Sequence, residues 1–131
     1  MDSKSYMADA TRTESVNFEG MNQRLNDDGL KRLLHAGIGL STEGGEFLDA
    51  LKKHIFYGKE LDRVNLSEEI GDIFWYLAIA CDELGIEFET VMARNIEKLK
   101  ARYGEKFTEE RAENRDLDKE RDILEKQDFS Q

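Results

Sequence analysis

Two pairs of carboxylates are the residues of this sequence best suited to chemistry, Glu43 with Glu46 and Glu69 with Asp72. The members of each pair are three positions apart, so on a helix they lie on one face, about 5–6 Å apart at their Cβ atoms. Both pairs border an apolar stripe, where ionised carboxylates are unfavourable unless something neutralises them. Because oxygen ligands suit hard divalent cations, the pattern indicates a Mg²⁺ or Mn²⁺ site if the two pairs meet.

The alternative is that these carboxylates are solvated acids on amphipathic helices. The sequence has 29 acidic residues, so the same spacing arises by chance, as in Glu110 and Glu113. Whether the pairs can meet depends on the loop expected at residues 58–64. A tight hairpin would leave the pairs out of register, whereas an extended loop could bring them level.

The elements that must position the carboxylates are predicted to be helices. Proline is absent and Leu, Glu and Lys are abundant, which favours an all-α fold. We expect a bundle of four main helices with short helices at each end. Residues 30–57 carry apolar residues at helical spacing, but four glycines interrupt them. These glycines indicate either a break near Ser41 and Thr42, which could cap a second helix, or close approach of another group to the backbone.

The next two helices have clearer boundaries. Asn65 can cap a helix, with Glu68 at the reciprocal position of a capping box. That helix is expected to end near Leu84, where Gly85 closes it. Its core face, at i, i+3, i+4 and i+7 spacing, consists of Ile70, Ile73, Phe74, Leu77, Cys81 and Leu84. A further helix is predicted from about Phe88 to Tyr103.

The length of 131 residues fits one domain, spanning residues 1–131. Residues 1–27 are polar and are expected to hold one short helix around Tyr6–Thr11. Residues 105–131 form a charged arm with a possible short helix near Lys119–Lys126.

Composition and charge exclude several classes of protein. The net charge of −10 argues against partners such as nucleic acid or an anionic membrane surface. The single cysteine, Cys81, cannot form an internal disulfide, and no apolar stretch approaches a membrane span. We therefore expect a cytoplasmic protein.

Three stretches together resemble the MazG-like family of all-α nucleoside triphosphate pyrophosphohydrolases. They are LHAGIGLSTEGGEFLDALKKH at residues 34–54, EEIGDIFWYL at residues 68–77 and NIEKLKARY at residues 95–103. The first two fit the family motif E-x-x-E followed by E-x-x-D. The likeness covers about residues 30–107. One departure is Ser41-Thr42, where the family favours an alanine- or valine-type residue and then glycine.

The resemblance implies that the metal ligands are Glu43, Glu46, Glu69 and Asp72, which would bind Mg²⁺ or Mn²⁺. It implies that water attacks the α-phosphorus of a nucleoside triphosphate and that pyrophosphate leaves. Glu43 is the candidate for orienting or deprotonating that water, and short phage-encoded members suggest a purine substrate such as dGTP. A catalytically idle nucleotide-binding module or a helical assembly protein are the alternatives.

Four residues are candidates for substrate binding. Lys98 and Arg102 could hold the β- and γ-phosphates, and Asn95 could bind sugar or phosphate. Lys53 lies on the row of Glu43 and could act similarly. The alternative is that these basic side chains only lie along helices with solvated heads.

The sequence also predicts a homodimer or homotetramer. With the core of the second carboxylate helix centred on Ile70 and Leu77, Trp75 and Ile79 project away from it at 100° per residue. One small domain cannot cover both sides of this helix, so a partner copy is expected to bury them. The alternatives are that residues 1–27 fold over this face or that Trp75 stacks on the substrate base.

Overall fold

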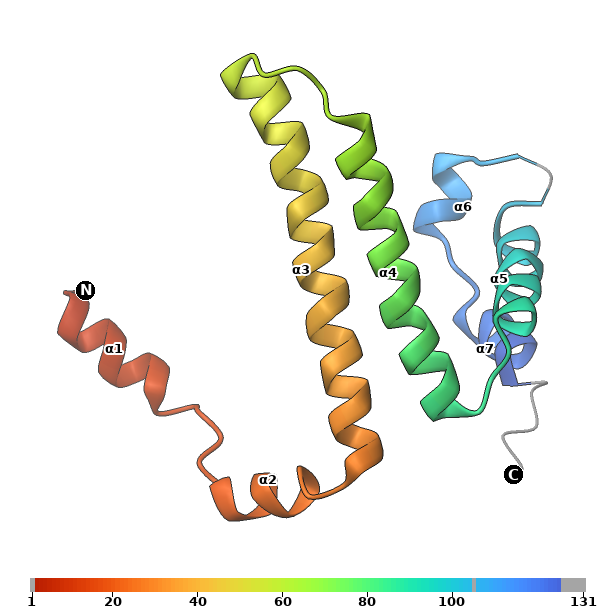
Figure 1. The fold of residues 1–131 in the computed structure, drawn as a ribbon. Helices are drawn as coiled ribbons and strands as arrows, with labels where there is room; N and C mark the ends of the chain where they lie inside the picture. Colours follow the sequence, from red (N-terminus) through yellow and green to blue (C-terminus); the bar gives the residue numbers. More distant parts are fainter. Residues whose placement is uncertain (1, 105, 126–131) are drawn as a thin grey trace.

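The computed structural model describes residues 2–104 and 106–125, which form seven helices and no strand (Figure 1). The all-α prediction is therefore confirmed for this part of the chain. Three helices are long, and the other four are short. In chain order they are α1 (Ser3–Thr11), α2 (Phe18–Arg24), α3 (Asp28–Tyr57), α4 (Arg63–Leu84), α5 (Phe88–Tyr103), α6 (Glu109–Glu113) and α7 (Leu117–Glu125).

Helix α3 is a single helix of 30 residues, without the break considered near Ser41 and Thr42. The two helices considered on either side of Ser41 and Thr42 are therefore one, and the bundle has three long helices where four main helices were expected. Both hydroxyls bond within the helix instead of capping a new one, since Ser41 Oγ donates to the Gly37 carbonyl and Thr42 Oγ1 to the Gly39 carbonyl, each at 3.0 Å. Asp27 caps the N-terminus by accepting from Leu30 N.

The close approach of another group explains one of the glycines in α3. Gly39 is buried where α3 packs against α4, and a Cβ atom there would overlap the ring of Tyr76. The two helices are antiparallel neighbours that pack along their length (Figure 1). Gly39 therefore allows Tyr76 to lie directly against the backbone of α3, one helical turn from Glu43.

Replacing Gly39 with alanine should lower the melting temperature and push α3 away from α4 beside the carboxylates. Gly71→Ala is the matched control, because a Cβ atom at Gly71 meets nothing within 4 Å. Alanine is better than glycine inside a helix by about 1 kcal/mol, so the control should be neutral or stabilising. Thermal unfolding of both variants measures the difference, and equal melting temperatures would contradict this account of the packing.

Helix α4 begins at Arg63, and its N-terminal cap differs from the one expected. Asp62, rather than Asn65, caps it, since Asp62 Oδ1 accepts from Val64 N and Asn65 N. Gly85 ends α4 in the left-handed conformation (φ 63°), as predicted. The connection from Tyr57 descends beside α3 before α4 starts (Figure 1). Glu43 thereby lies opposite Glu69 and Asp72.

Helices α5, α6 and α7 form a second group. Its α5 contacts both α6 and α7. A buried carboxylate fastens the group, since Glu120 on α7 is only 5% exposed and accepts hydrogen bonds from Arg102 on α5 and from Arg115. These guanidinium groups lower the pKa of Glu120 to about 2. Much of the charged arm is therefore tied to α5, although residues 105 and 126–131 lie outside the described residues.

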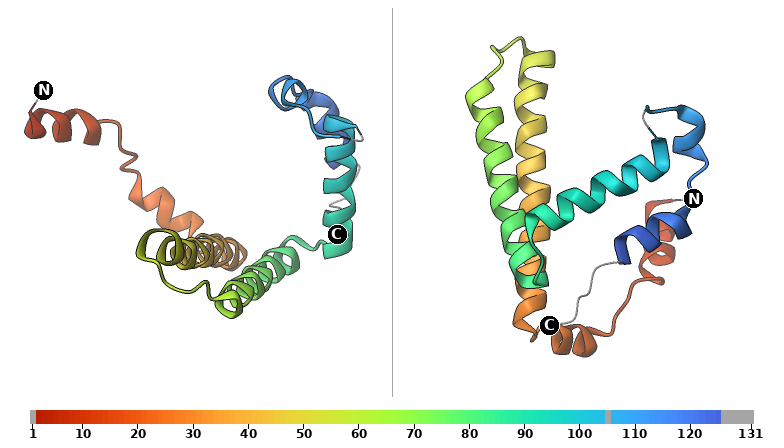
Figure 2. Two further views of the ribbon diagram at one scale, coloured as in Figure 1. Left: turned by 90° about the horizontal axis from the view of Figure 1, so that it is seen from above. Right: turned by 90° about the vertical axis from the view of Figure 1, so that its right-hand side faces the viewer.

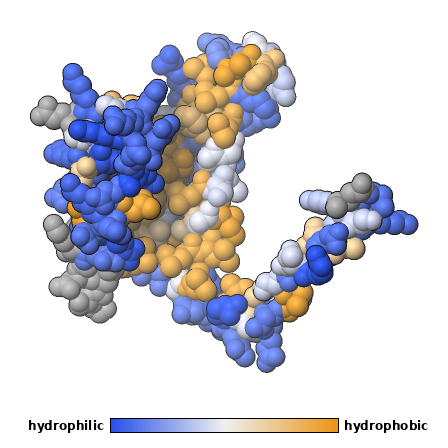
Figure 3. Space-filling view, turned by 180° about the vertical axis from the view of Figure 1, so that it is seen from behind, coloured by the Kyte–Doolittle hydropathy of each residue, from blue (hydrophilic) through white to orange (hydrophobic). Residues whose placement is uncertain are grey.

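The chain is open rather than compact. Seen from above, α1 with α2 on one side and α5–α7 on the other project from the α3–α4 pair (Figure 2). The hollow between them has an apolar floor (Figure 3). The accessible surface is 10830 Å², whereas a compact monomer of 15.1 kDa exposes about 7,100 Å².

None of the described helices is long and apolar enough to cross a membrane.

Candidate functional site

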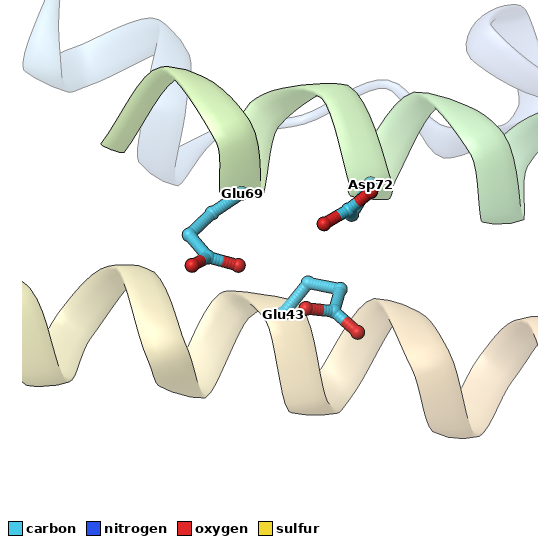
Figure 4. Close-up of side chains that lie close together, drawn as sticks. All are labelled: Glu43, Glu69 and Asp72. Carbon is cyan, nitrogen blue, oxygen red and sulfur yellow. The ribbon is translucent and has the colours of Figure 1, made fainter. Parts of the chain in front are cut away.

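Three of the four predicted metal ligands converge between α3 and α4. Glu43 from α3 faces Glu69 and Asp72 from α4 (Figure 4). One carboxylate oxygen from each lies within 4.8 Å of the others. Glu69 is buried at 3% exposure, Glu43 is partly buried and Asp72 is exposed, so the group opens to solvent on one side.

Glu46 lies one turn further along α3, is exposed and is outside this group of three. Its negative charge still acts on Glu43, as the pKa of Glu43 shows. The pKa of Glu43 is raised first by partial burial, then by the charge of Glu46 and by contact with Glu69. The hydroxyl of Thr42, 3.3 Å from Glu43 Oε1, opposes that shift.

The donor set fits a hard divalent cation. All three converging groups supply carboxylate oxygen, and their mutual repulsion is the situation that a bound cation relieves. Mg²⁺ and Mn²⁺ prefer such ligands, whereas the absence of sulfur and nitrogen donors from the group disfavours softer metals.

Replacing Glu43 with glutamine should stabilise the metal-free protein at neutral pH. Because the folded protein raises the pKa of Glu43 above 4.5, ionisation of this group opposes folding at pH values above 4.5. Glutamine removes that penalty, and the advantage should disappear below about pH 4.5, where the wild-type carboxyl is itself protonated. Melting temperatures in EDTA across this pH range measure the effect. A gain that persisted unchanged at pH 3 would contradict the electrostatic cause.

A residue that sequence reasoning assigned to capping belongs to this site. Asn65 Nδ2 donates to Glu69 Oε1 at 2.6 Å, and the two residues are four apart on α4. The i, i+4 spacing of Asn65 and Glu69 could have indicated this contact, but Asn65 is also a favourable N-cap residue, and the sequence alone does not distinguish the two roles.

The predicted substrate-binding residues are more dispersed. Lys53 Nζ lies 2.7 Å from Asp49 Oδ2, and the guanidinium of Arg102 binds Glu120. Asn95 and Lys98 line an apolar groove with residues of α5 and α7, including Met92, Val91 and Leu124. None of the three converging carboxylates lines that groove, so one chain does not combine the two sets of residues there.

Three aromatic rings of α3 and α4 contact one another. His35 is in edge-to-face contact with Trp75 and Tyr76, with ring centroids 6.2 and 5.6 Å apart. These contacts give His35 a packing role between α3 and α4. Trp75 remains 55% exposed, as expected for a residue that projects away from the core face.

Comparison with known proteins gives two findings. A family model described as the MazG nucleotide pyrophosphohydrolase domain matches residues 34–107, which include all four predicted metal ligands. The chain is also similar to "Gene 37 protein" of Mycobacterium phage L5, with 34% identity over 80 residues, which cover 57% of this chain and 69% of the phage protein. No solved structure gives a significant match.

Proposed function

Because the chain belongs to the MazG nucleotide pyrophosphohydrolase family, we propose that it hydrolyses a nucleoside triphosphate to the monophosphate and pyrophosphate with Mg²⁺ or Mn²⁺. The observation that carries the proposal is the convergence of Glu43, Glu69 and Asp72 within the matched residues. These carboxylates come from two separate motifs of the sequence, and their convergence supports a shared role in binding a cation over separate roles as solvated surface acids.

The chain's own residues have distinct tasks in this proposal. Glu69 and Asp72 on α4, with Glu43 and Glu46 on α3, hold the cation. When bound, the cation supplies the positive charge that an acidic protein needs to attract a triphosphate. Glu43, which faces the α4 carboxylates from α3, orients a water molecule and accepts its proton. That water attacks the α-phosphorus, the bond to the bridging oxygen breaks, and pyrophosphate leaves.

Substrate binding is proposed for Asn95 and Lys98. Lys98 lines the same groove as Asn95, where its ammonium group would bind a phosphate and the amide would bind sugar or phosphate. Lys53 and Arg102 are weaker candidates, because each already binds a carboxylate. The preference for a purine such as dGTP rests on the family resemblance alone.

The test is product analysis on a panel of canonical and modified triphosphates with Mg²⁺ or Mn²⁺. We expect nucleoside monophosphate and pyrophosphate in equal amounts. Orthophosphate with nucleoside diphosphate would contradict attack at the α-phosphorus. Metal-dependent binding without any product would instead support the non-catalytic nucleotide-binding alternative.

We also propose that the protein works as a homodimer or a dimer of dimers. Its surface exceeds that of a compact monomer by about 3,700 Å², as much as large permanent interfaces bury. The excess includes apolar residues of α4 that the sequence assigns to the core, since Ile70, Phe74 and Leu84 are all exposed in one chain. A second copy seated on this face of α4 would cover them.

A further inference from the structure

Asn65 lies in the first turn of α4 but does not cap that helix. Its backbone N–H is already satisfied by the Asp62 cap, at 3.0 Å. Its side chain therefore remains available, and Nδ2 donates to Oε1 of Glu69 at 2.6 Å. Residues four apart on a helix face the same way, so this contact follows from the helix itself.

The accepting carboxylate is the most buried of the converging group. Glu69 is 3% exposed, whereas Glu43 is partly buried and Asp72 is exposed. A buried carboxylate needs hydrogen-bond donors in place of the water that it has lost. It also has side-chain torsions that must be fixed if it is to point toward Glu43 and Asp72.

We infer that Asn65 is a positioning residue, which holds the carboxylate of Glu69 toward Glu43 and Asp72 so that the three can bind a divalent cation together. This inference rests on the proposed metal-dependent function. The amide engages one oxygen of Glu69 and leaves the other for the cation. An amide is well suited to this role because it carries no charge, so it neither competes with the cation nor adds to the repulsion among the carboxylates.

The test measures binding of Mn²⁺ alone, without nucleotide, by electron paramagnetic resonance of the free ion. Asn65→Leu keeps the branching and the number of side-chain heavy atoms but removes the donor, and Asn65→Ala is the second variant in case the larger leucine disturbs folding. Loss of an outer hydrogen bond to a metal ligand typically weakens metal binding by about 10–100-fold. We expect that loss in both variants, with helical content preserved in circular dichroism.

Glu68→Gln is the matched control. Glu68 precedes Glu69, is exposed and is outside the converging group, so its removal changes the local charge without changing the hydrogen bond. The control should bind Mn²⁺ within about twofold of the wild type, because an exposed charge is largely screened by solvent.

The outcomes separate this inference from the proposed function. If the wild type binds Mn²⁺ and both Asn65 variants bind it equally tightly, the positioning role is wrong while the metal site stands. If the variants only melt at lower temperature in EDTA with unchanged Mn²⁺ affinity, Asn65 has a structural role and the inference is also wrong. If the wild type itself binds no Mn²⁺, the metal site and this inference fail together.

Discussion

Replacing Asp72 with alanine should reduce turnover by roughly a hundredfold or more while leaving the helices intact, the size of effect seen when one group that stabilises developing charge is removed. Asp72 is exposed, so its carboxylate contributes little to the core. It nevertheless lies within 4.8 Å of oxygens of Glu43 and Glu69. Its loss should also stabilise the metal-free protein slightly, because one source of like-charge repulsion disappears. Pyrophosphate release in Mg²⁺ and melting in EDTA measure the two effects.

Glu46→Ala extends the test to the ligand that stands outside the converging group. We expect turnover to be lost here as well, because the proposed site includes Glu46. Glu68→Gln is the control and should retain activity. Near-normal activity of Asp72→Ala or Glu46→Ala in Mg²⁺ would show that the site assignment is wrong.

Replacing Phe74 with glutamate should convert the assembled protein to a partly unfolded or dissociated form. Phe74 is 57% exposed in one chain, although it belongs to the apolar face of α4. A charge placed there would have to be buried against a second copy, which is strongly unfavourable without a partner charge. Light scattering at micromolar concentration would show the loss of the dimer or tetramer.

Val64→Glu is the control for that experiment. Val64 is 80% exposed at the start of α4 and is not part of the predicted apolar face, so the substitution should leave the assembly unchanged. The wild-type protein provides the stricter test. A stable, active wild-type monomer of 15 kDa would contradict the proposed assembly.

Local signals in the sequence predicted the ends of some helices closely. Helix α5 runs from Phe88 to Tyr103 as predicted, and α4 ends at Leu84 because Gly85 adopts the left-handed conformation there. These boundaries depend on the spacing of apolar residues and on glycine, which are properties of a short stretch of chain.

Features that depend on distant residues were harder to predict. The glycines of α3 raised the possibility of a break, and the deciding contact between Gly39 and Tyr76 joins residues 37 positions apart. Asn65 and Asp62 are both good caps, and only the fold assigns the side chain of Asn65 to Glu69. The pairing of Arg102 with Glu120 was likewise one of many possible ion pairs.

The site was predictable in its residues but not in its arrangement. The spacing of the carboxylates indicated which side chains share a helical face, whereas their register depended on the path of the loop after Tyr57. The apolar stripe of α4 was predicted as core, and Phe74 and Ile70 in it are exposed in one chain. A sequence pattern records that a face is buried, but not whether its own chain or another copy buries it.

The open shape of the single chain links folding to the law of mass action. If much of the apolar surface is covered only by another copy, the free energy of unfolding includes the free energy of association and so depends on the amount of protein present. The melting temperature should then rise with concentration. Dilution would lower the activity per chain, because each subunit that leaves its partner exposes Ile70 and Phe74 on the helix that carries Glu69 and Asp72.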